Sequence, residues 1–229
     1  MSSVAADPHA VHAHAQHHPS LAHQFDNLDQ QRESSTLGMW IFLVTEIMFF
    51  GGLFTAYVIY RSQFSAAFQA ASHHLNVIMG GANTAVLILS SLTMAMAIWA
   101  AQVNRRKLIV VFLILTMLLG ATFLGVKYFE YKEKFTHHLV PGPNFEFDGP
   151  DPQHAQIFFS LYFIMTGLHA LHMIIGIGVL TWLAVLSWKG RFNSEYHNPL
   201  ECAGLYWHFV DIVWIFLFPL LYLLGAHAH

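Results

Sequence analysis

Charged residues and cysteines are scarce in this chain of 229 residues. Only 10% of the residues are Asp, Glu, Lys or Arg, which excludes an ordinary soluble domain. The net charge of −3 gives no indication of nucleic-acid binding. The single cysteine, Cys202, excludes a disulfide within the chain and a cysteine-based zinc or iron–sulfur site. The chain is 55% hydrophobic, and this composition indicates one compact membrane domain.

Residues 1–36 differ in composition from the rest of the chain. They lack the basic segment and the apolar core of a secretory signal, so no cleavage is expected. Their histidines could chelate a metal weakly, but no oriented second shell is apparent. We therefore predict a flexible, His-rich cytoplasmic tail. The histidines in question are His9, His12, His14, His17, His18 and His23.

Five apolar stretches are long enough to cross a bilayer, which takes about 20 residues at a rise of ~1.5 Å per residue. We predict an all-α membrane protein in which residues 37–226 form a bundle of five transmembrane helices. The fourth stretch is longer than a bilayer requires and should tilt or protrude. Pro219, in the last stretch, is tolerated in a packed membrane helix and can introduce a kink. The stretches cover about residues 37–60, 76–101, 108–130, 157–188 and 203–225.

The distribution of basic residues predicts the orientation of the bundle. Six lie on the same side as the amino terminus, namely Arg32, Arg105, Arg106, Lys107, Lys189 and Arg191. Four lie on the other side, namely Arg61, Lys127, Lys132 and Lys134. Because cytoplasmic loops carry the excess of Lys and Arg, we expect a cytoplasmic amino terminus and a periplasmic carboxyl terminus. The connection 131–156 is then external, and its prolines should prevent a long helix there.

The last apolar stretch carries two ionisable residues, His208 and Asp211. Such groups at membrane depth normally face protein or a water-filled cavity. Positions three apart are neighbours on a helix, so the two side chains can meet on one face. Two interpretations stay open: a hydrogen-bonded pair that only fixes helix packing, and a direct part in chemistry.

Three further ionisable residues lie within the apolar stretches: Glu46 in the first, and His169 and His172 in the fourth. We expect them to form, with the pair above, a polar layer in the cytoplasmic half of the bundle. Glu46 is either a proton-accessible group or a neutral acid bonded to Thr45 or to an adjacent helix. Haem ligation by the histidines is disfavoured, since close histidine pairs more often hydrogen-bond to neighbouring helices. A stand-alone membrane cytochrome is disfavoured for the same reason.

Characteristic sequences occur in Leu37–Gly52, Thr166–Gly176 and Tyr206–Leu223, and in this order they resemble the cytochrome c oxidase subunit 3 family. YWHFVDIVWIFLFPLLYL (Tyr206–Leu223) resembles the last helix of that family. LGMWIFLVTEIMFFGG (Leu37–Gly52) resembles its helix with a buried glutamate, at the position of Glu46. TGLHALHMIIG (Thr166–Gly176) is similar to its two-histidine segment, with His169 and His172 as those histidines. Glu130, Glu201 and Trp207 fall on further motif positions.

The resemblance implies a non-redox core subunit of a proton-pumping respiratory haem-copper oxidase, which reduces O2 to water. Such a subunit has no haem, copper, other metal or catalytic redox residue of its own, because the haem and copper belong to subunits I and II. It packs against subunit I, supports its proton uptake and stability, and can hold phospholipid. The complex takes its electrons from cytochrome c or, in the alternative, from quinol.

The helix count differs from that of the familiar mitochondrial form, which has seven helices. Five-helix members occur in bacteria, so the resemblance implies a multi-pass protein of a bacterial inner membrane. An alternative of another class is a stand-alone proton-coupled transporter or channel. No internal repeat and no paired broken helices of the kind that many transporters show are apparent in the sequence.

Overall fold

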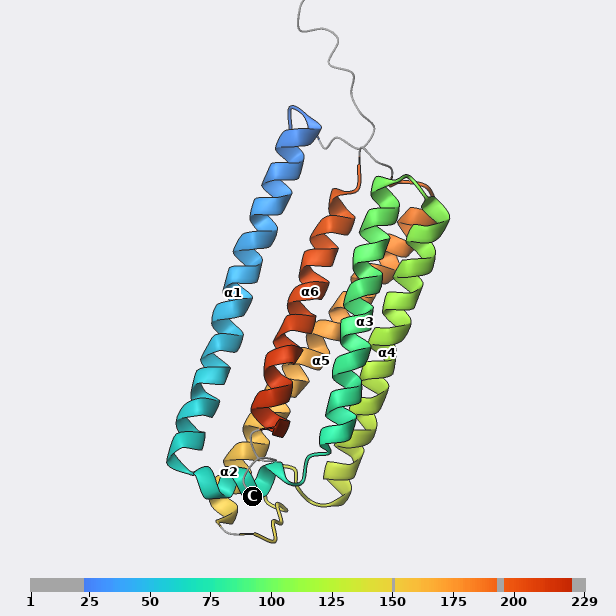
Figure 1. The fold of residues 1–229 in the computed structure, drawn as a ribbon. Coiled ribbons are helices and arrows are strands. Elements are labelled where there is room, and N and C mark those ends of the chain that lie inside the picture. The colour runs from blue at the N-terminus through green and yellow to red at the C-terminus, as the bar shows by residue number, and fades with distance from the viewer. Residues whose placement is uncertain (1–22, 150, 193–195, 224–229) are drawn as a thin grey trace, which may run out of the picture.

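The computed structural model of the chain describes residues 23–149, 151–192 and 196–223. This part forms six α-helices and a short π-helical turn. Five of the helices are long and apolar enough to cross a membrane, and they pack into one elongated bundle (Figure 1). The prediction of an all-α membrane protein with five transmembrane helices is confirmed. Most of the predicted tail, residues 1–22, lies outside the described residues.

The first helix, α1 (Leu28–Gln63), begins at Leu28 rather than at the predicted residue 37. Asn27 caps it, since the Asn27 side chain accepts a hydrogen bond of 2.8 Å from the backbone N–H of Gln30. Asp29 in the first turn complements the helix dipole. Residues 30–33, which are Gln, Gln, Arg and Glu, are good helix formers, so the helix begins before its apolar part.

A short helix, α2 (Ser65–Ser72), follows α1, and the apolar pattern does not predict it. Its buried face includes Phe68, whose ring packs edge-on against Phe158 with centroids 5.4 Å apart. The same ring lies 5.5 Å from that of Tyr57. At eight residues α2 is too short to span a bilayer, and it closes one end of the bundle (Figure 1).

The helices α3 (Val77–Gln102) and α4 (Arg106–Thr136) form an antiparallel hairpin (Figure 1). Asn104 in the connection has a φ of 57°, in the left-handed region that asparagine tolerates better than most residues. Small and hydroxyl-bearing residues let the two helices approach closely. The hydroxyls of Thr93 and Thr116 accordingly lie 2.7 Å apart in the buried interface.

The helix α5 (Pro152–Trp188) begins at Pro152, before the predicted start at residue 157. The side chain of Asp151 accepts a hydrogen bond of 3.4 Å from the N–H of His154. A proline fits the first turn of a helix, where no N–H is needed. Pro152 therefore starts the helix instead of preventing one. With 37 residues α5 is longer than a bilayer requires, and it crosses obliquely behind α6 (Figure 1).

The last helix, α6 (Asn198–Phe218), lies between α1 and α3 (Figure 1). At Pro219 the chain changes to a π-helical turn, η2 (Pro219–Leu223). A proline inside a helix removes one backbone hydrogen bond, and π turns accommodate such interruptions. The hydroxyl of Tyr57 donates to the carbonyl of Leu220 at 2.8 Å, which connects α1 to this turn.

The connections alternate between the two ends of the bundle. The start of α1 and the α3–α4 and α5–α6 connections lie at one end, whereas α2, the α4–α5 connection and η2 lie at the other (Figure 1). The basic residues predicted to share the amino-terminal side all belong to the first end.

Candidate functional site

Glu46 of α1 and His172 of α5 face each other at the interface between these helices. Nε2 of His172 lies 3.2 Å from Oε2 of Glu46, and the side chains are only 13% and 19% exposed. Phe50 packs edge-on against the imidazole, with ring centroids 5.4 Å apart. The hydroxyl of Thr45 donates to the carbonyl of Phe42 at 2.6 Å. The sequence analysis offered two hydrogen-bond partners for Glu46, Thr45 and a residue of an adjacent helix. The structure shows the second, because Glu46 contacts His172 whereas Thr45 bonds to the backbone.

The hydrogen bonds of His172 determine where its protons lie. Nδ1 lies 2.8 Å from the carbonyl oxygen of Leu168. Because a carbonyl only accepts, Nδ1 carries a hydrogen. The contact between Nε2 and Glu46 then holds one proton, on the carboxyl group or on the imidazole. The two side chains therefore share this proton across the interface between α1 and α5.

His208 and Asp211 of α6 both turn towards α3, where each bonds to a serine. Nδ1 of His208 forms a hydrogen bond with the hydroxyl of Ser91. The hydroxyl of Ser90 accepts from the indole N–H of Trp207 at 3.1 Å. Its one hydrogen is shared between the carbonyl of Leu87 at 2.9 Å and Oδ2 of Asp211 at 3.4 Å. Helical spacing places the two ionisable groups on one face, as predicted, but their partners come from the neighbouring helix.

His169 lies one turn before His172 but in an apolar environment. Its side chain is fully buried between the rings of Phe123 and Trp214, whose centroids each lie 5.2 Å from the imidazole. Neither ring nitrogen has a hydrogen-bond partner in the part of the chain that the structure describes. The predicted polar layer is thus divided into three groups with different partners: the Glu46–His172 pair, the serine-bonded residues of α6, and His169 alone.

A second buried polar cluster joins α4, α5 and η2. Nζ of Lys127 lies 3.0 Å from Oε2 of Glu130, and both side chains are almost completely buried. The ammonium also donates to the hydroxyls of Tyr222 at 2.8 Å and Tyr162 at 3.3 Å. Both hydroxyls donate in turn to Oε1 of Glu130. The cluster satisfies the hydrogen bonds of a charge pair inside the bundle.

Sequence reasoning identified Glu130 only as a motif position and did not predict its partners. The spacing of Lys127 and Glu130, three residues apart on one helix, was the available signal. Tyr162 and Tyr222 lie far away along the chain, and only the packing of α5 and η2 against α4 brings them to the pair.

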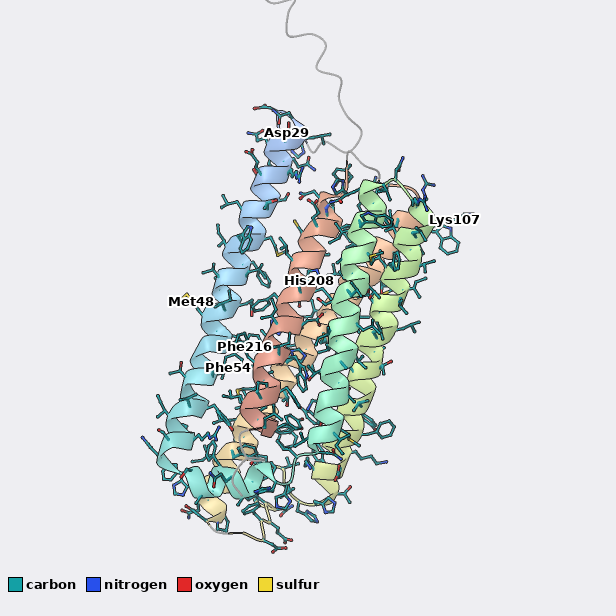
Figure 2. The ribbon with its side chains drawn as sticks, in the orientation of Figure 1. Asp29, Met48, Phe54, Lys107, His208 and Phe216 are labelled. Carbon is teal, nitrogen blue, oxygen red and sulfur yellow. The ribbon has the colours of Figure 1, made fainter. Side chains whose placement is uncertain are left out.

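A groove runs between α1 and α6. Its wider part, about 890 Å³, has a charged rim, and an apolar part of about 490 Å³ adjoins it. Figure 2 shows Phe54 and Phe216 facing each other in the apolar part, whereas Met48 points away from the bundle. His208 lines both parts and also a third hollow, of about 430 Å³, between α3 and α6. The rim residues are Asp29, Arg32, Glu33 and Glu201.

Comparison with known proteins identifies the family. The family model described as "Cytochrome c oxidase subunit III" matches residues 29–226, which include all five membrane-spanning helices except the first residue of α1. The chain belongs to the cytochrome c oxidase subunit III family.

Relatives in this family include subunits of two kinds of oxidase. The cytochrome bo(3) ubiquinol oxidase subunit 3 of Pseudomonas aeruginosa is 28% identical over 229 residues, which cover 99% of this chain and 100% of the relative. The cytochrome c oxidase subunit 3 of Synechocystis sp. is 37% identical over 191 residues, covering 82% of this chain and 74% of the relative. The quinol oxidase subunit 3 of Bacillus subtilis is 30% identical over 216 residues, covering 93% of this chain and 97% of the relative.

Trp207, one of the predicted motif positions, lies in a space that two glycines leave open. A Cβ atom at Gly120 of α4 would lie 2.9 Å from Cη2 of Trp207, and one at Gly176 of α5 would lie 3.0 Å from Cζ3. The indole is only 1% exposed, so it has no room to move away. Trp207 therefore fixes the distances between three helices of this subunit III.

Glu201, another predicted motif position, lies at the first turn of α6, at the charged rim of the groove. Its carboxylate lies 3.2 Å from Nε2 of His197 and 3.5 Å from the guanidinium of Arg32. The contact with Arg32 joins the starts of α1 and α6. Within the described ranges, no group of three or more His, Cys, Asp or Glu side chains could hold a metal ion.

Proposed function

We propose that this chain is subunit III of a bacterial terminal oxidase that reduces O2 to water and pumps protons. Family membership supports the assignment to a haem-copper oxidase complex. The complex then resides in the inner membrane, with the basic end of the bundle, which includes the start of α1, in the cytoplasm and the end of α6 in the periplasm. The haem and copper belong to partner subunits I and II, and this chain binds subunit I directly without redox chemistry of its own. The chain can also hold phospholipid.

The Glu46–His172 pair is the observation that carries the proposed role in proton uptake. It is a partly buried carboxyl–imidazole contact within a membrane-spanning bundle, and its hydrogen-bond pattern holds one exchangeable proton. Ionisable groups at this depth are expensive to bury and commonly belong to proton pathways. A group that binds a proton between α1 and α5 can supply it to subunit I of the oxidase during turnover.

The test is Glu46→Gln in the complete oxidase. Glutamine keeps the shape and an acceptor oxygen but cannot exchange a proton, so we expect an unchanged haem spectrum together with slower proton uptake or a shorter turnover lifetime. Glu33→Gln is the matched control, because Glu33 is an exposed carboxyl on the same helix. Prolonged turnover kinetics identical to those of the unchanged enzyme would restrict Glu46 to a packing role. Purification of the chain as a self-sufficient transporter without a haem-containing subunit would contradict the whole assignment.

Cytochrome c and quinol are the two candidate electron donors of the complex. Quinol is favoured by the full-length match to the ubiquinol oxidase subunit of P. aeruginosa, and cytochrome c by the higher identity to the Synechocystis subunit. The decisive measurement is the copper content of the subunit II that co-purifies with this chain. A copper site in that subunit assigns cytochrome c, and a subunit II without copper assigns quinol.

A further inference from the structure

Five basic residues gather where α3 joins α4 and where α5 joins α6. The two connections lie at the same end of the bundle (Figure 1), and Lys107 marks that end in Figure 2. Residues 103–107 and 188–192 contain no Asp or Glu. The ion pairs between described residues all involve other side chains. These ends of α4 and α5 therefore have an excess of positive charge. The five residues are Arg105, Arg106, Lys107, Lys189 and Arg191.

The start of α4 strengthens the attraction for an anion. No acidic residue lies in its first turn, and no side chain caps it. The N–H groups of a first helical turn form the positive end of the helix dipole, so cations placed there repel it. A negative group close to this turn would interact favourably with the N–H groups and with the basic side chains at the same time.

The side chain of Arg106 connects the start of α4 with the turn that follows α5. A Cβ atom at Gly190 would collide with the guanidinium of Arg106. Gly190 also has a φ of 79°, in the left-handed region that favours glycine. The glycine thus gives the guanidinium a place at this turn, whose other residues include Lys189 and Arg191. The cations of the two connections therefore form one basic cluster.

An apolar slot of about 330 Å³ between α4 and α5 begins beside this cluster. Lys189 and Trp188 line the slot at the end of the bundle. Ile114 and Val185 line it further in, and they are 42% and 48% exposed. Ile114 follows Arg106 by two helical turns, so the slot extends about 12 Å into the membrane at ~1.5 Å per residue. Trp188 is 75% exposed, at the headgroup level where tryptophan is enriched.

The order of cations, tryptophan and apolar slot along the membrane normal matches one class of ligand. A phosphodiester accepts charge-assisted hydrogen bonds from Arg and Lys, and the acyl chains of a phospholipid enter the hydrocarbon directly below it. A soluble anion would leave the apolar slot unfilled. A zwitterionic lipid would bring a second, positive group to a cluster that is already positive. Basic pockets between membrane helices bind anionic headgroups for these reasons.

We propose that this end of α4 and α5 binds an anionic phospholipid. Its phosphate lies between Arg106 and Lys189, and one acyl chain lies in the slot between the two helices. The proposal rests on the proposed function, which places the chain in a membrane and lets it hold phospholipid, and it adds the site and the headgroup class.

The experiment uses the complete complex in vesicles of equal phosphatidylglycerol and phosphatidylcholine. One of the two lipids carries a photoactivatable acyl chain, and labelled peptides of this chain are mapped. Each cation near the membrane surface contributes a factor of about five, so two cations give about 25-fold stronger labelling of residues 110–114 and 181–188 by the phosphatidylglycerol probe. Equal labelling by the two probes, or no labelling of these residues, would overturn the proposal. So would displacement of the lipid by excess inorganic phosphate, which would indicate a simple anion site.

Substitutions of the cations test which side chains hold the headgroup. Arg106→Gln and Lys189→Gln should each lower the preference for phosphatidylglycerol about fivefold, whereas Arg106→Lys keeps the charge and should retain most of it. Lys132→Gln is the matched control, because Lys132 is exposed at the opposite end of the bundle. Equal haem content of the complexes controls for folding. A preference unchanged by both glutamine variants would contradict the proposal. Failure of any haem-containing subunit to co-purify with the unchanged chain would instead contradict the proposed function and leave the labelling readable.

Discussion

Lys127 and Glu130 form a buried ion pair, with Nζ 3.0 Å from Oε2. Two tyrosine hydroxyls complete its hydrogen bonds, and the ring of Trp214 lies 4.9 Å from Nζ. Burying two charges is expensive even when they are paired, so such a pair is poor evidence for a stabilising role. Its partners lie on α4, α5 and η2, and a misplaced element would leave a charge without a partner. The pair therefore selects one arrangement of these three elements.

Removing the cation alone should destabilise the bundle strongly. Lys127→Met leaves the Glu130 carboxylate buried and unpaired, and we expect a loss of about 3–5 kcal/mol in the free energy of unfolding. Adding Glu130→Gln removes the stranded charge and should recover most of this loss. The measurement is unfolding in detergent micelles, with the exposed Lys132→Met as control. If Lys127→Met and Lys132→Met change the free energy of unfolding equally, the buried pair does not select the arrangement of α4, α5 and η2.

The Glu46–His172 contact should appear as a coupling energy between α1 and α5. In a double-mutant cycle of Glu46→Ala and His172→Ala, we expect a coupling of about 0.6–1.7 kcal/mol, as measured for hydrogen bonds between membrane helices. The cycle uses unfolding free energies in the same detergent. Additive effects of the two substitutions would mean that the side chains do not interact.

His169 and His172 of α5 should respond differently to substitution by leucine. His169 has two buried nitrogens without partners in the described chain, so His169→Leu removes unsatisfied polar atoms and should leave the thermal midpoint equal or higher. His172→Leu breaks the bonds to Leu168 and Glu46 and should lower it. A fall in the midpoint for the first variant as large as for the second would indicate a polar partner of His169.

The space around Trp207 should make one glycine of α4 irreplaceable. A Cβ atom at Gly120 would lie 2.9 Å from the fully enclosed indole, so Gly120→Ala should destabilise the protein by about 1–3 kcal/mol. Gly125 on the same helix has no atom within 4 Å of such a Cβ. Gly125→Ala should therefore be neutral or stabilising by up to about 1 kcal/mol, through helix propensity. Thermal midpoints of the two variants test this, and equal values would contradict it.

The helix boundaries show which parts of the fold the apolar pattern of the sequence predicts. Apolar length predicts the five spans because hydrocarbon must be crossed by a continuous hydrophobic helix. It does not predict the start of α1 at Leu28 or of α5 at Pro152, because capping by Asn27 and Asp151 and helix propensity extend these helices beyond their apolar parts. The amphipathic helix α2 was not predicted, because its eight residues are too few to show the helical periodicity of apolar residues.

The sequence by itself determined the membrane class, the number of spans and the helix that carries each ionisable residue. All of these follow from local composition and the bilayer thickness. Only the tertiary structure decided that Glu46 meets His172, that His208 and Asp211 bond to serines of α3, and that Lys127 meets two distant tyrosines. Helical spacing fixes the side of a helix on which a residue lies. Its partner depends on the rotation and depth at which neighbouring helices pack, and these are set by contacts such as Trp207 against Gly120 and Gly176.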